Sequence, residues 1–561
     1  MLGSNLSPLG YSYRDYSSIV AALQNLLPSY IPSINDTSIA TSFTLKFLSV
    51  ISGVTDIMSG YIDIQVGESS LAQCQQLRNA IAISTSQLFY KLQGKSSSMV
   101  NLTFTNPTPV VGSPLDIPKW TEVDSNTTSL VSYITILDVF IPVGETTISV
   151  DAIQASIINN ETLINSSNGS VNQIYRLSNT GAIRNYMNLT VGGVQWNLVD
   201  DLMDYGSTDN VFEIIYDEYM NASVVFGDGI NGTIPSPGST IVCTYLITLG
   251  SSGMVSKNVL TSMKSQIGSL TVTNLLASSG GGDGDTISTI RNSAPGVWKS
   301  IKRAVTNEDY QYLANQVSGV YSSLANITNN GWNVNVVVFP IGGGQATQTL
   351  LTNVYNYISP KTIEGLVLTT SSIQLANILM SLNIVLKSII YDKNLVKQNI
   401  LNAIKNALSY QNVIIGVGFR ISDIAGIIDS IDGVSYVDNI IFTRYPTVIQ
   451  SNLLDSSAIV SIFPGVTYSD WTIVALANNN FSVYKGSVLV GLGTVDTLWS
   501  NSEISIMLQN SIIENDTWTF TTSIYNGNIE LNPQEIMALN QDSDITLNLY
   551  YPYEYKGFGG Q

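Results

Sequence analysis

The sequence contains no histidine among its 561 residues. Without an imidazole there can be no Ser-His-Asp or Cys-His nucleophile, no histidine-ligated zinc and no histidine general base. Carboxylate-based glycoside hydrolysis and oxygen-ligated Ca²⁺ or Mg²⁺ sites remain open. The absence excludes several large enzyme classes, and we expect no catalytic residues, no bound metal and no cofactor.

Charge and cysteine are also scarce. Charged side chains make up 11% of the chain, against about 25% in typical domains, and such a surface is typical of a subunit buried against partners. The net charge of −18, with no basic run, argues against nucleic acid as a partner. Cys74 and Cys243 lie far apart, in a predicted helix and a predicted strand, and we interpret them as small buried hydrophobes.

No uninterrupted apolar run reaches the ~18–20 residues of a membrane span. Residues 1–20 also lack the basic-then-apolar order of a signal peptide. We therefore expect no membrane span and synthesis in the cytoplasm of the producing cell.

The chain is too long for a single hydrophobic core, so we predict an α+β multidomain protein. Periodicity changes from helical to alternating and back along the sequence. The predicted parts are N-terminal helices (1–95), a β-rich domain (96–255), a linker and connecting helix (256–300), two small α/β sandwich modules (301–380 and 381–445) and a C-terminal β-rich domain (446–561). Within them, residues 413–419 are predicted as a strand and 278–285 as a linker or tight turn.

Apolar residues in the first predicted helix recur at spacings of three and four. Only Lys46 and Asp56 are charged between residues 37 and 60, which leaves little ordinary solvent face. Two interpretations remain open: the helix is buried within its own chain, or it joins an intersubunit bundle. The candidate residues for such a bundle are Ile39, Phe43, Phe47, Val50, Val54 and Ile57.

The stretch 224–255 reads as strand, glycine-rich turn, proline-rich turn and strand. Its glycines permit positive φ, Asp228 and Asn231 can bond their own backbone, and Pro235 favours an extended exit. A Ca²⁺ site at Asp228 and Asn231 is the functional alternative, although a single carboxylate makes a poor cage. Further along, Thr306 and Asp309 have the spacing of a helix N-cap.

Three short motifs, in order, resemble those of the baseplate J-like family, which includes wedge proteins of T-even and Mu-like contractile phage tails. The first comprises Phe226, Gly227, Asp228, Gly229, Asn231, Gly232, Pro235, Gly238 and Tyr245, followed by the turn Gly250–Gly253. The second comprises Gly281, Gly282 and Asp283, then Arg291 to Pro295. The third comprises Arg303, Ala304, Val305, Thr306, Asp309 and Tyr310. Asp285 and Met254 depart from the family pattern, and nothing beyond residue 446 matches it.

The resemblance implies an elongated structural subunit of the virion tail baseplate. Such a wedge subunit forms the inner ring, links wedges, and rearranges to trigger sheath contraction and genome ejection. Its implied partners are a second copy of itself, a second wedge protein, a small sheath-initiator-like protein and the central hub or spike. The residues around Arg303, Thr306 and Tyr310 would then be either cap and core residues of a module or interface contacts.

Two other classes of function stay open at this point. A receptor-binding or adhesin-like protein is suggested by aromatic residues of the C-terminal part: Trp471, Trp499, Trp518 and Tyr550–Tyr555. A cell-wall glycosidase would need paired carboxylates, for which the candidates are Asp200 with Asp201 and Asp283 with Asp285. Adjacent acidic residues are usually solvated, so we regard this as the weaker alternative.

Overall fold

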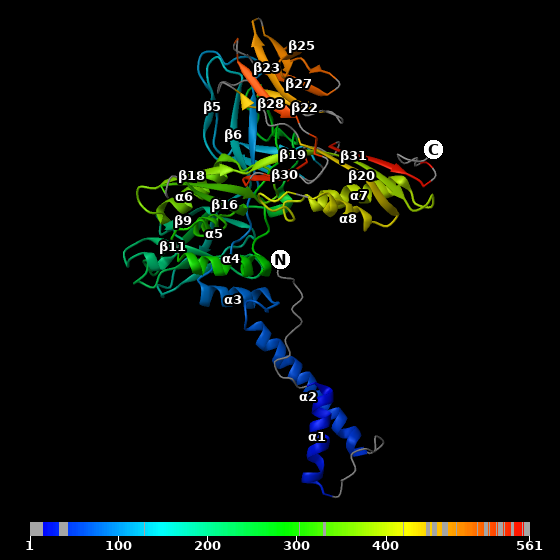
Figure 1. The fold of residues 1–561 in the computed structure, drawn as a ribbon. Helices are drawn as coiled ribbons and strands as arrows, with labels where there is room; N and C mark the ends of the chain where they lie inside the picture. The colour runs from blue at the N-terminus through cyan, green and yellow to red at the C-terminus, as the bar shows by residue number, and fades with distance from the viewer. Residues whose placement is uncertain are drawn as a thin grey trace. The chain divides into compact units, whose positions relative to one another are not determined.

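The computed structural model has the predicted α+β multidomain architecture, with helices and several sheets (Figure 1). It describes residues 15–32, 43–127, 130–301, 303–328, 332–418, 420–444, 449–450, 457–462, 469–477, 479–501, 503–509, 514, 516–522, 524–525, 531, 533–539, 544–552 and 554. Ile39, predicted as a bundle residue, lies outside these ranges. The chain forms two compact units, the first made mainly of residues 1–336 and 347–370, the second mainly of residues 371–561.

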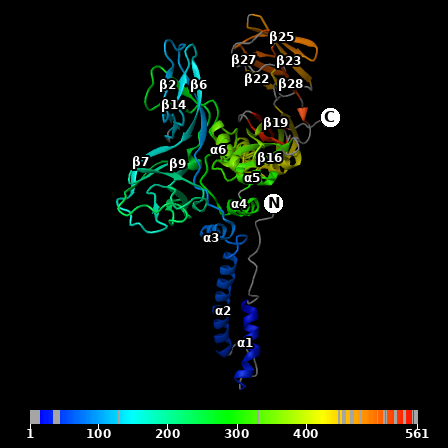
Figure 2. The same ribbon diagram turned by 90° about the vertical axis from the view of Figure 1, so that its left-hand side faces the viewer.

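The first unit begins with three helices: α1 (Tyr16–Tyr30), α2 (Phe43–Glu68) and α3 (Leu77–Leu88). The Asp15 carboxylate caps α1 by accepting from the Ser18 backbone N–H, in a reciprocal capping box. Both views show α1 beside α2 (Figures 1 and 2). Beyond α2, the Glu68 carboxylate accepts from the backbone N–H groups of Gln75 and Gln76.

A six-stranded antiparallel sheet follows, in the order β14-β3-β4-β6-β1-β15. Its strands are β1 (Met99–Thr105), β3 (Glu122–Ser125), β4 (Ser132–Thr135), β6 (Thr147–Gln154), β14 (Leu260–Met263) and β15 (Thr271–Thr273), and β2 (Leu115–Ile117) pairs with β5 (Val139–Ile141) beside it. One face buries a core that includes Leu102, Phe104 and Tyr133. Because β14 and β15 pair with β3 and β1, the β-rich region continues to residue 273 instead of ending at 255.

A seven-stranded sheet has the order β7-β13-β9-β10-β11-β12-β8. Its strands are β7 (Ser156–Ile164), β8 (Ile174–Arg176), β9 (Ala182–Val191), β10 (Val194–Leu198), β11 (Val211–Tyr216), β12 (Ala222–Phe226) and β13 (Ile241–Ile247). Its core also contains residues of α3 and of α4 (Ile287–Ser300), among them Ala80, Ile290 and Ala294. The helical start is thus joined to this sheet by a shared apolar core.

The first α/β module has a three-stranded sheet, ordered β16 (Val320–Thr328), β17 (Asn333–Pro340) and β18 (Val367–Ser372). Its helices are α5 (Asn307–Ala314) and α6 (Gln348–Ile358). The hydroxyls of Thr286, Thr306 and Thr347 cap α4, α5 and α6. Threonine at an N-cap satisfies a backbone donor that the first helical turn leaves unpaired.

The second unit contains the other module, in which β19 (Gln374–Leu386) pairs antiparallel with β20 (Val434–Arg444). Helices α7 (Lys393–Ala407) and α8 (Ile421–Asp429) pack their isoleucines into its core. Two late strands, β30 (Glu535–Ala538) and β31 (Ile545–Tyr550), add to β19 in parallel, and β29 (Ile524–Tyr525) pairs with β20. Residues 545–550 were grouped with the C-terminal β domain by their pattern, but they complete the module's sheet.

The remaining strands form a two-sheet sandwich. One sheet is β21-β28-β23-β24-β25 and the other is β22-β27-β26. The bounds are β21 (Ile449–Gln450), β22 (Ser457–Ile462), β23 (Ser469–Leu476), β24 (Asn480–Lys485), β25 (Val488–Thr494), β26 (Trp499–Ser500), β27 (Ile504–Gln509) and β28 (Thr517–Thr522). Trp471 and Trp518 lie fully buried in its core, so two of the aromatics that suggested an adhesin serve packing.

Two sequence-based predictions need correction. Residues 413–418 form turns instead of a strand, because Gly416 takes a positive φ and donates its N–H to the Glu535 carbonyl. Segment 278–285 is no exposed linker, since most of its residues are buried.

Among the residues that the structure describes, one helix, Lys46–Glu68, could cross a membrane by length and composition, with a mean hydropathy of 1.3. The sequence had led us to expect no such helix.

Candidate functional site

The glycine-rich turn after β12 is held by local bonds and by backbone bonds to residues 172, 206 and 209 of the same sheet region. The Asp228 carboxylate accepts from the backbone N–H groups of Ile230 (2.8 Å) and Asn231 (2.7 Å), which hold the pKa of Asp228 below its ordinary value. At Gly227 a Cβ would lie 2.3 Å from the carbonyl oxygens of both Asn231 and Gly232, so only glycine fits. Phe226 packs edge-on against Trp196 in the core of the seven-stranded sheet.

The proline-rich exit and Tyr245 complete this motif. Gly238, at φ 85°, donates its N–H to the Ser167 carbonyl, and the Ser167 hydroxyl donates to the Pro235 carbonyl at 3.0 Å. The Tyr245 hydroxyl donates to Glu161, and burial together with this bond raises the pKa of Tyr245 to about 12. Every bond of the motif thus fixes the geometry of one sheet. No group of three or more acidic or cysteine residues suited to a metal occurs among the described residues.

Two motifs that are distant in the sequence meet in a buried junction, which we define as residues 96–99, 248–254 and 278–285. The Asp283 carboxylate accepts from the Ser251 backbone N–H (3.1 Å) and from its hydroxyl. A Cβ at Gly250 would lie 2.4 Å from Asp283 Oδ1, and a Cβ at Gly281 would lie 2.8 Å from the Gly250 carbonyl oxygen. The glycines therefore allow two backbone segments to approach more closely than any side chain would permit.

Three serines preceding β1 contribute side-chain hydrogen bonds to the junction. The Ser96 hydroxyl donates to the Gly280 carbonyl (2.7 Å) and the Ser97 hydroxyl to the Gln154 carbonyl (2.6 Å). Ser98 lies 2.7 Å from the Tyr133 hydroxyl, and both contact the Gly253 carbonyl oxygen. These polar groups are buried and hydrogen-bonded. A buried network whose groups are all paired favours a single arrangement of the backbone segments around it.

A buried carboxylate, Asp285, ties the junction to the segment after α3. Asp285 Oδ2 accepts from the Tyr90 hydroxyl and from the Gln93 backbone N–H, each at 2.8 Å, and the Asp285 N–H donates to the Gln93 carbonyl. Only 7% of the residue is exposed. Burial raises the pKa of Asp285 to about 6, although both donated bonds oppose this shift.

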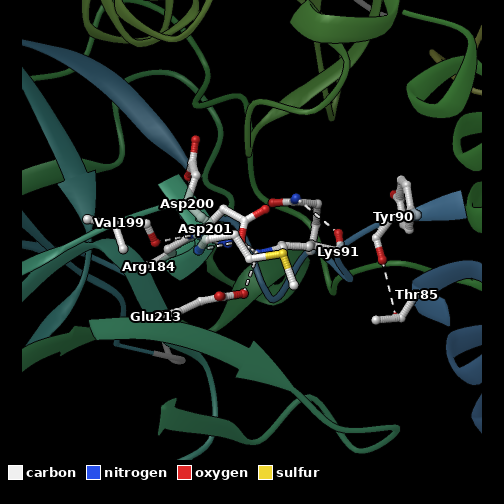
Figure 3. Close-up of polar contacts among 10 residues, drawn as sticks. Thr85, Tyr90, Lys91, Arg184, Val199, Asp200, Asp201 and Glu213 are labelled. Atoms are coloured by element: carbon white, nitrogen blue, oxygen red, sulfur yellow. Dashed lines mark hydrogen bonds and ion pairs between the residues drawn. The ribbon is translucent and has the colours of Figure 1, made fainter. Parts of the chain in front are cut away.

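A lysine anchors the same segment to the seven-stranded sheet (Figure 3). Lys91 Nζ donates to the Glu213 carboxylate and to the Asp200 carbonyl, and lies 3.9 Å from Asp201. Arg184 pairs with the Asp200 carboxylate at 3.1 Å. Lys91, Arg184, Asp200 and Asp201 line part of a cavity of about 570 Å³ in the first unit. Both carboxylate pairs considered for glycoside hydrolysis are thus engaged: Asp200 and Asp201 with basic side chains, Asp283 and Asp285 in the junction.

Arg291 of α4 ties the segment between α2 and α3 to the rest of the first unit. Its guanidinium donates to the Leu71 carbonyl (2.8 Å) and to the Cys74 carbonyl, both between α2 and α3. Pro295 lies within α4, where it is exposed, and the next residue, Gly296, packs closely against the Tyr312 ring.

The third motif begins the first module. Thr306 and Asp309 form the predicted reciprocal capping box of α5. Ala304 is buried and bridges to Thr362, Tyr310 is fully buried, and Arg303 and Val305 are exposed. The structure thus places Ala304, Thr306, Asp309 and Tyr310 as cap and core residues, and leaves Arg303 and Val305 on the surface.

The predicted bundle residues Phe43, Phe47, Val50, Val54 and Ile57 all lie on α2, and all are exposed. Helix α2 is therefore not buried on several sides by its own chain. Burial within the chain was the first of the two interpretations of this helix.

Sequence reasoning missed Ser96–Ser98, Gln154, Tyr133, Tyr90 and Lys91. Isolated serines and a single glutamine carry no periodic signal, so only the fold reveals them. The structure brings together the turn Gly250–Gly253 and the run Gly281–Asp283. The turn at 226–238 instead contacts residues 167–173 and 206–211 of its own sheet.

No family model matches the chain, and no curated protein matches it. Among solved structures, a chain in the sixfold-symmetrised cryo-EM structure of the anti-feeding prophage baseplate is similar to it. The match covers 76% of this chain and 86% of that one, with 12% sequence identity and a TM-score of 0.27. At this score the likeness does not establish a shared fold.

Proposed function

We propose that this chain is a structural wedge subunit of a contractile tail baseplate, without catalytic activity. It forms part of the inner ring, links neighbouring wedges and rearranges when the sheath contracts. The three sequence motifs occur in the same order as in the baseplate J-like family, and this order supports a contractile tail as the particle that contains the chain. One observation supports assembly as the function: α2 has an exposed row of apolar side chains, which we call the seam.

The seam has the spacing of a coiled coil. Seven apolar side chains recur along the 26-residue helix at alternating steps of four and three, the a and d positions of a heptad repeat. They are 54% to 82% exposed, although such positions normally face a partner helix. The seam residues are Phe43, Phe47, Val50, Val54, Ile57, Tyr61 and Ile64.

The opposite face of α2 is already occupied. Ser52 and Ser59, both buried, lie on that face, and α1 packs against α2. Gly53 and Gly60 lie one heptad apart beside the seam, and a Cβ on either would meet nothing within 4 Å. Each glycine inside a helix lowers helix stability by roughly 1 kcal/mol relative to alanine, and no packing within the chain explains these two glycines. A closely approaching helix of another subunit would explain them.

By length and hydropathy the same helix could cross a membrane, and exposed apolar residues such as Met58 and Ile62 also lie outside the seam, but its circumference is not apolar throughout. Asp56 and Asp63 lie one heptad apart, away from the seam. A lipid-facing helix is apolar around its whole circumference, whereas a bundle helix has one apolar stripe. The arrangement favours a protein partner over lipid.

The contacts of the segment after α2 support the same proposal, because they hold this segment against the rest of the first unit. Asp285 and Arg291 bond to residues 71–93, directly after α2, and Lys91 of that segment bonds to Glu213. A subunit that transmits force between a bundle and a ring needs such a rigid connection.

The proposal is tested by locating the chain in intact particles. The full chain, carrying a C-terminal tag, is expressed in the producing cell, and tail-like particles are purified and imaged with a gold-labelled antibody. We expect label in a sixfold ring at one end of the sheath. Label along fibres would favour a receptor-binding role, and particles without label would refute the proposal.

A further inference from the structure

The cavity in the first unit lies where four parts of the chain meet. Its walls come from the segment after α3, the seven-stranded sheet, the end of α4 and the first α/β module. Its volume of about 570 Å³ falls within the range of about 300–1,000 Å³ that is usual for ligand sites. Helix α2 contributes nothing to its lining, so the cavity is a candidate site separate from the seam.

The charge of this cavity differs from that of the chain as a whole. Acidic residues exceed basic ones by 41 to 23 in the sequence, but four basic and three acidic side chains line the cavity. The four basic residues are Lys91, Lys95, Arg184 and Lys361. A cavity that gathers positive charge in an acidic protein favours an anionic ligand.

Several hydrogen-bond donors of the cavity have no acceptor within the chain. The Arg184 guanidinium uses only Nη2, which donates to the Val199 carbonyl and to the Asp200 carboxylate (Figure 3). Among the residues that the structure describes, no partner is bonded to Arg184 Nε and Nη1, to the Lys95 ammonium or to the Tyr357 hydroxyl. The Arg184 side chain is only 15% exposed, and a charged donor in such a place binds a carboxylate more strongly than it does in bulk water.

Tyr357 of α6 keeps its proton at neutral pH. Burial raises the pKa of Tyr357 to about 12, with Asp200 adding to the rise and Arg184 opposing it. Its hydroxyl therefore remains a donor and lies close enough to both groups to be affected by their charges. The cavity thus has donors from the seven-stranded sheet and from the first module.

An exposed pair of aromatic rings lies at the edge of the cavity. Phe89, which lines it, is 62% exposed and stacks on Trp298, which is 53% exposed, with 5.7 Å between the ring centroids. Phe89 ends α3 with a φ of 53°, and Ile301 ends α4 with a φ of 48°. Large side chains rarely adopt this conformation, which glycine usually supplies at a helix end. Residues held in this way are concentrated at ligand and partner sites, and here they present apolar side chains to solvent.

We propose that this cavity binds an acidic peptide segment of a partner protein. One carboxylate side chain of the segment enters the cavity and accepts hydrogen bonds from Arg184 and Lys95, and a neighbouring large apolar side chain packs on the Phe89–Trp298 pair. A peptide fits better than a free acid because the aromatic pair extends the site beyond the cavity. Nucleic acid fits less well, since three aspartates lie among the cations.

The proposal is tested with the full-length chain and short synthetic peptides by isothermal titration calorimetry. Each acetylated and amidated peptide carries one aspartate and one tryptophan, separated by none to four glycines, so that different spacings are sampled. We expect at least one peptide to bind saturably, and its counterpart with asparagine in place of aspartate to bind at least tenfold more weakly. The absence of saturable binding, or equal affinities of the two peptides, would overturn the proposal.

Two variants test where the peptide binds. Lys95→Gln should weaken binding at least fivefold, whereas Lys257→Gln removes an exposed charge outside the cavity and should leave binding unchanged. Trp298→Ala should also weaken binding at least fivefold, and Trp332→Ala, at a position 60% exposed, is its control. Melting temperatures verify that each variant is folded.

Equal effects of either variant and its control would overturn the proposal. Inorganic phosphate that displaces the peptide at the peptide's own concentration would assign the cavity to small anions, and would overturn the peptide as its ligand.

Discussion

The junction and helix α2 use glycine in opposite ways. In the junction, Gly250 and Gly281 allow backbone segments of the same chain to touch, and the neighbouring polar groups are paired within the chain. On α2, Gly53 and Gly60 border open space beside an exposed apolar seam. One region is complete in a single chain, whereas the other, in our proposal, is completed only in an assembly.

The largest effect is expected for Gly250→Ala. Gly250 has φ 70°, and its Cβ would lie 2.4 Å from Asp283 Oδ1 and 2.9 Å from the Gly282 carbonyl oxygen. We expect the free energy of unfolding to fall by about 2–4 kcal/mol, measured by denaturant titration. Gly238→Ala is the matched control, since it has φ 85° with nothing within 4 Å and should lose only about 1 kcal/mol from backbone strain. Equal losses would mean that close approach in the junction is unimportant.

The next effect concerns pH. Because the folded chain raises the pKa of Asp285 to about 6 from its ordinary 3.8, folding favours the neutral acid. Its contribution to stability is complete below pH 3.8 and is lost as pH rises through about 6. From pH 7.5 to pH 5 the wild type should therefore gain about 1–2 kcal/mol relative to Asp285→Asn. Parallel curves of melting temperature against pH for the two proteins would contradict this, and Asp283→Asn serves as the control.

The smallest effect has the opposite sign. Gly60→Ala adds a methyl group in open space within a helix, so the isolated chain should become more stable by about 0.5–1 kcal/mol. The same variant should assemble less well, because the methyl group keeps a neighbouring helix away. Thermal unfolding of the chain and its incorporation into particles are measured together. A variant that is more stable and assembles normally would show that the glycine has no partner.

Local signals were predictable from sequence. The Thr306 capping box and the Asp228 turn arise from residues within a few positions of one another, and each was confirmed. Long-range pairing was not predictable in this way. Nothing local in residues 545–550 distinguishes pairing with β19 from pairing within the sandwich, and Ser96 and Ser98 of the junction have partners more than a hundred residues away.

Exposure was the other feature that sequence could not decide. The heptad spacing of α2 predicts a seam but not whether the seam faces its own chain. The aromatics Trp471 and Trp518 show the converse, because residues expected on a binding surface lie in the sandwich core.

The central claim is tested most directly by the reactivity of a thiol placed in the seam. Val54→Cys is labelled with a maleimide in the free full-length chain and in purified particles, and each yield is compared with that of the unfolded protein. The account predicts rapid labelling of the free chain, where Val54 is 54% exposed, and at least tenfold slower labelling in the particle. Equal rates in both states would show that the seam stays uncovered, and would contradict the claim that α2 is completed by other subunits.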